Sequence, residues 1–350
     1  MVHKARAELR HFECWVPAML ADELLREEGH SATHRQMMEQ AKNAVTNAVR
    51  FVLDREVVVA AQLVTEARPS SLIQGLPLCR LPYPTTWFEY AGRDRPGSCA
   101  VGTIVPHRVG LLCDAAPDAP NEVTVNVFWH NGGRTDHLEH CPVALLADLT
   151  AEGQLSRHPV LGRQKRGATA EGLRQALLAT SHDHNRKVAA DQQELEAALA
   201  FSNRIFFVKS HYFAPLAAEI VTQRGPGALE WLLQQSQDNV EGEASLLLGI
   251  LMLLNTRNGT RRQPADLTRL NTVRLKRGRQ PLLDHWTVTL RLSKGLSRGM
   301  AQSGIPAHEM RAHLVRGHFK IRRSGIYWWS PHVRGKVALG GIRHDYQVKM

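Results

Sequence analysis

The stretch Val123-Thr124-Val125-Asn126-Val127-Phe128-Trp129 alternates its three valines with other residues at a period of two. Successive side chains of a β-strand point to opposite faces, so the valines and Trp129 share one face. The residues that follow, Asn131-Gly132-Gly133, are typical of a turn. This stretch therefore predicts a strand with one apolar face, and a sheet is expected around it.

Helical patterns occur on both sides of this strand. An amphipathic helix is indicated by apolar residues at spacings of three and four, namely Met37, Met38, Ala41, Ala44, Val45, Ala48 and Val52. Residues 57–64 (VVVAAQLV) are rich in β-branched side chains and predict a buried strand. Residues 244–254 (ASLLLGILMLL) fall short of the roughly 20 needed to cross a bilayer and predict a core helix.

The order of these patterns is helix, strands, helices and a strand-rich tail, without regular βαβ alternation or an internal repeat. This order predicts an α+β fold, in which a helical and mixed-sheet body is followed by a basic, strand-rich C-terminal region ending in a β-hairpin.

Charge divides the chain unevenly. The net charge is +11 over 350 residues, but residues 255–350 hold 20 Lys or Arg against four acids, a net +16. Residues 1–254 hold 24 basic and 29 acidic residues, a net −5. We therefore divide the chain into an acidic α+β body, 1–254, and a basic C-terminal region, 255–350, which packs on the body as one domain or stands apart.

Such segregation favours a polyanionic partner, because Lys and Arg that neutralise phosphates release counterions. The alternatives are a solvated basic surface, and a basic tail that docks on the acidic body or on an acidic protein.

The C-terminal hairpin is predicted from two alternating segments, HFKIRR at 318–323 and IYWWS at 326–330, which flank Ser324-Gly325. A two-residue Ser-Gly turn would pair Arg322 with Tyr327 and Lys320 with Trp329. These four side chains would then share a face suited to phosphate contact and base stacking. The opposite face would carry Phe319, Ile321 and Trp328.

The same region resembles a known group of proteins. HLVRGHF at 313–319 and WWSPHVRG at 328–335, with patches at 82–89 and 271–282, are similar to the tail of uncharacterised proteins encoded by tailed phages and prophages. The resemblance implies a phage context and the bacterial host cytoplasm, and it implies no activity or catalytic residue.

Our leading hypothesis is a phage-encoded, non-enzymatic protein that binds DNA or RNA through its basic region and needs no cofactor. The candidate nucleic-acid-binding residues are Arg274, Lys276, Arg277, Arg279, Arg316, His318, Lys320, Arg322, Tyr327, Trp329, His332 and Arg334. One alternative is a phage protein that binds and inhibits a host or defence enzyme. Another is a metal-dependent nuclease that uses the tail histidines.

Metal and nucleophile signatures are weak in this sequence. His308-Glu309 lacks a second histidine four residues after the first, which excludes the zinc-protease motif. The metal candidates that remain are His130, His137, His140 and Cys141, whose spacing matches no familiar template. The five cysteines form no CxxC pair and, without a signal segment or a membrane span, indicate reduced thiols in an intracellular protein.

Overall fold

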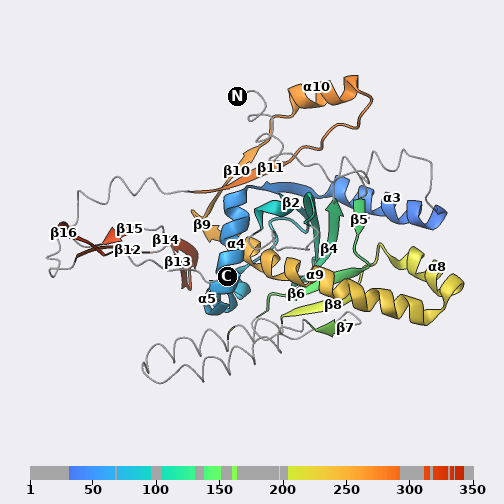
Figure 1. Ribbon diagram of the computed structural model, residues 1–350, viewed down its shortest axis with the longest axis horizontal. Coiled ribbons are helices and arrows are strands. Elements are labelled where there is room, and N and C mark those ends of the chain that lie inside the picture. Colours follow the sequence, from blue (N-terminus) through green and yellow to red (C-terminus); the bar gives the residue numbers. More distant parts are fainter. Residues whose placement is uncertain are drawn as a thin grey trace.

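The computed structural model describes residues 31–67, 69–95, 105–130, 138–150, 160–163, 197, 204–291, 311–315, 318–329, 332–334 and 336–342. These residues form helices and mixed sheets, which confirms the α+β fold that the sequence predicts (Figure 1).

The largest sheet has ten strands in the order β10-β11-β1-β2-β3-β4-β6-β8-β7, with β5 paired to β4. Its strands are β1 (Val49–Leu53), β2 (Thr85–Ala91), β3 (Arg108–Ala116), β4 (Ala119–His130), β5 (Leu138–His140), β6 (Val143–Asp148), β7 (Val160–Arg163), β8 (Ile205–Lys209), β10 (Thr260–Pro264) and β11 (Trp286–Leu290). The neighbours β11, β1 and β2 run parallel, whereas the other pairs are antiparallel.

The predicted strand of alternating valines is the middle of β4, which lies between β3 and β6. Val123, Val125 and Val127 are buried in the main core, and Trp129 packs against that core. The opposite face is covered as well, because Asn126 and Phe128 are also buried. A sheet buried on both faces requires a layer of helices on each side.

Helices form those two layers. α4 (Arg55–Ala67), α5 (Pro69–Gly75) and α9 (Pro226–Leu254) pack on the face that carries the β4 valines. α3 (Ala32–Asn47) and α8 (Ala214–Arg224) pack on the face that carries Phe128. Short 3-10 helices, η2 (Leu76–Leu78) and η3 (Gly92–Asp94), lie at either end of the segment that contains β2.

The apolar run at 244–254 forms the C-terminal part of α9, and its side chains from Leu246 to Leu254 are buried, as expected for a core helix. Within the described residues, no helix combines the length and apolar character needed to span a membrane.

The expected strand at residues 57–64 is instead helix α4. Its buried residues, Val57, Val58, Ala61 and Val64, follow a helical period, while Leu63 is 52% exposed. α9 approaches α4 closely, because a Cβ atom at Gly249 would lie 2.1 Å from the carbonyl oxygen of Ala61. Packing against α9 therefore outweighs the preference of β-branched residues for strands.

The C-terminal region is partly continuous with the body. β11 pairs in parallel with β1, and β10 closes that edge of the large sheet. Between these strands α10 (Thr268–Lys276) projects beyond the sheet (Figure 1). Two three-stranded sheets follow, made of β9 (Thr256–Arg257), β13 (His318–Arg322) and β14 (Gly325–Trp329), and of β12 (Arg311–Val315), β15 (His332–Arg334) and β16 (Lys336–Ile342).

The predicted hairpin is β13–β14, but its register differs from the expected one. Arg322 pairs with Gly325, Ile321 with Ile326 and Lys320 with Tyr327, so the turn residues are Arg323 and Ser324. The expected register would have placed Arg323 opposite Ile326, which is buried. The observed register moves this arginine into an exposed turn, and Gly325 adopts the φ of +131° that follows it.

Candidate functional site

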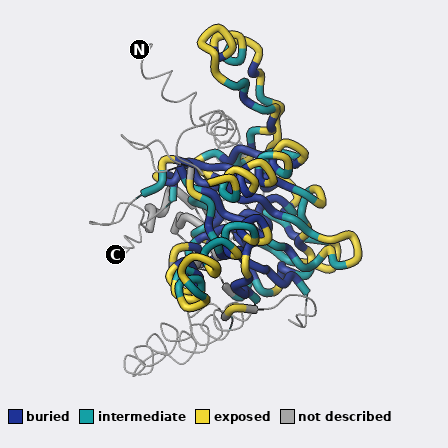
Figure 2. The backbone as a smooth tube through the Cα atoms, turned by 90° about the vertical axis from the view of Figure 1, so that its right-hand side faces the viewer, coloured by how far each residue is buried: buried dark blue, intermediate teal, exposed yellow. Residues whose placement is uncertain are grey.

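The strongest concentration of cations in the described chain lies on residues 260–291, which we call the basic arm. The basic arm comprises β10, α10 and β11, and it holds eight Lys or Arg against two Asp. All but one of these cations are exposed, namely Arg261, Arg262, Arg269, Lys276, Arg277, Arg279 and Arg291. Figure 2 shows the arm as a mostly exposed projection at the top of the molecule.

The arm has a defined internal structure. Asn271 of α10 donates through Nδ2 to the carbonyl oxygen of Leu282 at 3.0 Å and accepts from the amide of Leu282 at 2.8 Å. Leu267 and Leu282 bury their side chains together. These contacts hold the returning segment against the helix, so the cations at the tip are carried on an ordered base.

The tip turns sharply after α10. Gly278 has a φ of +65°, a conformation that favours glycine. At the other end of the helix, Asp266 accepts a hydrogen bond from the amide of Thr268 at 3.1 Å, and this bond lowers the pKa of Asp266. A carboxylate at the N-terminus and cations at the C-terminus both complement the helix dipole.

Three of the four candidates on the arm, Lys276, Arg277 and Arg279, are exposed around this turn. The fourth, Arg274, is only 5% exposed and donates through Nε to the carbonyl oxygen of Gln280 at 2.6 Å. Its guanidinium therefore holds the turn together and is not presented to a partner. Arg269 adds an exposed cation that the sequence had not singled out.

The change of register leaves the same side chains on each face of the hairpin, because each residue of β13 pairs with a residue two positions away from the expected one. Lys320, Arg322 and Tyr327 still share one face. On the opposite face, Ile326 is buried in the main core, and the rings of Phe319 and Trp328 lie 4.8 Å apart between centroids.

Tyr327 is engaged by a residue that sequence reasoning missed. Arg257 of β9 lies beside it, donates through Nη1 to its hydroxyl at 3.3 Å, and places its guanidinium carbon 5.6 Å from the ring centroid. The Oγ of Ser324 lies 3.0 Å from the same hydroxyl. The signal for Arg257 was slight, because only its place at the start of the basic region distinguished it.

The remaining tail candidates lie wholly or partly outside the described residues. Arg316 lies outside the described residues, and so do the side chains of His318, Trp329, His332 and Arg334, although the backbones of these four belong to β13, β14 and β15. Their proposed roles stay predictions.

The metal candidates divide between the two faces of the sheet. Cys141 is buried in the core beneath α9, and burial raises its thiol pKa to about 12. His140 contacts Phe128 and Tyr212 on the opposite face, with ring centroids at 4.8 and 6.1 Å. His130 is buried at the end of β4, and His137 lies outside the described residues. Among the described residues, no three His, Cys, Asp or Glu side chains gather as they would around a metal ion.

Two ion pairs, which sequence reasoning also missed, fasten β2 to its neighbours; the Glu89–Arg108 pair is buried, and the Glu243–Arg95 pair is partly buried. Glu89 of β2 accepts from Nε and Nη2 of Arg108 at 2.9 Å, and its other oxygen accepts from Trp87 Nε1 at 3.1 Å. On the opposite face, Glu243 of α9 accepts from Arg95 at 2.9 Å and from the Tyr90 hydroxyl. Burial, followed by the Glu243 charge, raises the pKa of Tyr90.

Comparison with known proteins adds no relative. No family model matches the chain, and neither the curated proteins nor the solved structures contain a significant match.

Proposed function

We propose that this protein, phage-encoded as its sequence resemblance suggests, binds nucleic acid through its basic arm. The observation that carries the proposal is the set of four exposed cations on α10 and the turn that follows it, Arg269, Lys276, Arg277 and Arg279. None of their side chains forms a hydrogen bond or ion pair with another described residue. Cations held without counter-charges attract a polyanion such as the phosphate backbone.

The chemistry favours contact with the backbone over readout of bases. Lysine and arginine on a projecting helix reach phosphates without regard to sequence. Four phosphate contacts on duplex DNA give a slope of about −3.6 in a plot of log affinity against log salt, or about a 150-fold loss between roughly 50 and 200 mM. The Lys320, Arg322 and Tyr327 face of the hairpin supplies a second basic surface with an aromatic ring.

Fluorescence anisotropy with labelled duplex DNA, single-stranded DNA and RNA tests the proposal. Changing Lys276, Arg277 and Arg279 to Gln removes three charges, and the salt slope on duplex DNA is expected to fall by about 2.7. The matched control changes the exposed Arg35, Arg55 and Arg224 of the body to Gln, which lowers the net charge equally. The control is expected to bind as the unmodified protein does.

Two results would refute the proposal. One is the absence of binding to all three nucleic acids at low salt, and the other is an equal loss of affinity in the arm variant and the control. A partner protein that the arm retains from a host lysate after nuclease treatment, with no binding to nucleic acid, would instead favour an inhibitor of a host enzyme.

A further inference from the structure

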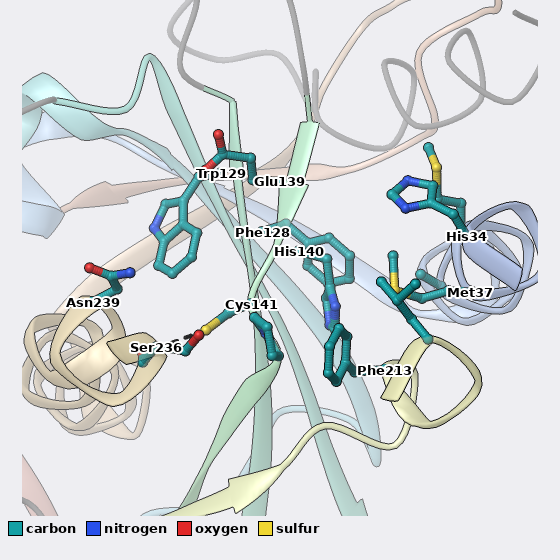
Figure 3. Close-up of a pocket in the computed structure, with 14 residues that line it drawn as sticks. His34, Met37, Phe128, Trp129, Glu139, His140, Cys141, Phe213, Ser236 and Asn239 are labelled. Atoms are coloured by element: carbon teal, nitrogen blue, oxygen red, sulfur yellow. Dashed lines mark hydrogen bonds between the residues drawn. The ribbon is translucent and has the colours of Figure 1, made fainter. Parts of the chain in front are cut away.

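A cavity far from the basic arm has the properties of a small-molecule site. It lies between β4, β5, α3, the start of α8 and the middle of α9, and its volume is about 330 Å³ (Figure 3). This volume falls at the lower end of the range of small-molecule pockets, roughly 300–1,000 Å³. None of its lining residues belongs to the arm, so the cavity does not overlap the proposed nucleic-acid surface.

Most of the lining is aromatic or sulfur-containing. Met37 and Met38 belong to α3 and Phe128 to β4, and Phe213 directly precedes α8. Figure 3 shows the ring of His140 at the centre of the cavity, near Phe128 and Phe213. Thioether groups and ring faces pack well against another flat ring, and flexible methionines adapt to its outline.

One nitrogen of the His140 imidazole lacks a hydrogen-bond partner. The hydroxyl of Ser210 donates to Asn126 Oδ1 at 2.6 Å, which uses its only proton. The contact of 3.2 Å between Ser210 Oγ and His140 Nε2 then requires that Nε2 carry the imidazole proton. His140 Nδ1 is left as a bare acceptor, buried and without a partner among the described residues.

The acceptor is also uncharged. Burial, together with the nearby His211 and His34, lowers the pKa of His140 to about 3, so the ring stays neutral at physiological pH. A buried acceptor without a donor is unfavourable, and a ligand N–H or O–H relieves the penalty. Because Nδ1 has almost no accessible surface, a ligand reaches it only when the imidazole turns, which the broad minimum of the second side-chain torsion of histidine allows.

We propose that this cavity binds a small, neutral aromatic molecule that donates one hydrogen bond to His140 Nδ1. The rings and thioethers select the flat apolar body, the bare nitrogen selects the donor, and the neutral imidazole provides no charge to hold an anion. A compound of eight to ten heavy atoms is expected to bind with a Kd on the order of 0.1–1 mM.

Fluorine NMR with three probes tests the proposal on the full chain. 4-Fluorophenol has the donor, 4-fluoroanisole is the same ring without it, and 4-fluorobenzoate carries a charge. We expect 4-fluorophenol to bind about tenfold more tightly than 4-fluoroanisole, and 4-fluorobenzoate to show no binding. Failure of 4-fluorophenol to bind at millimolar concentration, or equal or tighter binding of either other probe, would overturn the proposal.

Three variants locate the bound probe. Leu216→Trp fills the cavity from α8 and is expected to abolish binding, whereas Val221→Trp, at an exposed position of the same helix outside the cavity, is expected to retain it. His140→Phe keeps a ring but removes Nδ1, so the phenol and the anisole should bind equally. Unchanged binding by Leu216→Trp would contradict the assignment, and so would a tenfold preference for the phenol over the anisole that persists in His140→Phe. If Leu216→Trp fails to fold, the His140→Phe comparison still tests the proposal.

Discussion

Acidification is expected to destabilise the native protein through His140. Its pKa is about 3 in the native state, against an ordinary value of 6.5. Between these values only the unfolded state holds the extra proton, so the free energy of unfolding falls by about 1.36 kcal/mol for each pH unit below 6.5. From pH 6.5 to about pH 4.5 the contribution of this one side chain is about 2.3 kcal/mol, because the unfolded imidazole is already half protonated at pH 6.5.

The variant His140→Phe isolates this contribution, because it keeps an aromatic ring that has no proton to bind. Urea denaturation at several pH values should show that the unmodified protein loses about 2.3 kcal/mol more than the variant over that range. The neighbouring His211, whose pKa burial also lowers, and Asp114, whose pKa burial raises, are present in both proteins.

NMR provides a direct check, because the chemical shifts of the His140 ring should show no titration of the imidazole above about pH 4.5. Parallel stability profiles of the two proteins, or a titration of His140 near its ordinary pKa, would refute the argument.

Three further predictions concern other parts of the structure. Gly249→Ala should lower the free energy of unfolding by about 1–3 kcal/mol, because its Cβ would lie 2.1 Å from the carbonyl oxygen of Ala61. Gly227→Ala, at an uncrowded position of the same helix, should not destabilise the protein in parallel urea titrations, and a stable Gly249 variant would refute the close packing. Asn271→Ala removes two hydrogen bonds to Leu282 and should speed hydrogen exchange in α10, measured by mass spectrometry, while β4 exchanges as before. Alkylation of the native protein, mapped by mass spectrometry, should spare Cys79, Cys113 and Cys141, because these thiols are buried and have raised pKa values. Rapid labelling of any of the three would contradict that burial.

Several local features could be read from the sequence because they depend on a period or on composition. The alternation at Val123–Trp129 indicated a strand, and the spacings of three and four from Met37 to Val52 indicated a helix with one buried face. That helix, α3, ends at Asn47, and the expected helical position Val52 lies instead in β1. The α+β class followed from the order of such patterns. The arm's charge was also visible, since net charge needs no knowledge of pairing.

The hairpin shows the limit of such reasoning. Alternation within each segment correctly placed Lys320, Arg322 and Tyr327 on one face. The register was decided by which residue could occupy the exposed turn, and Arg323 could not remain opposite the buried Ile326. The burial of Ile326 therefore determined which two residues form the turn. This changed every cross-strand pair but left each side chain on its expected face.

The sequence by itself determined the periodic elements and the segregation of charge, because both are properties of neighbouring residues. The tertiary structure decided what depends on distant segments. Residues 57–64 became a helix because α9 offers a close surface at Gly249, and Arg274 became a buried support because its guanidinium meets the Gln280 carbonyl. The His140 cavity is also of this kind, since its walls and its Asn126–Ser210 partners come from parts of the chain that only folding brings together.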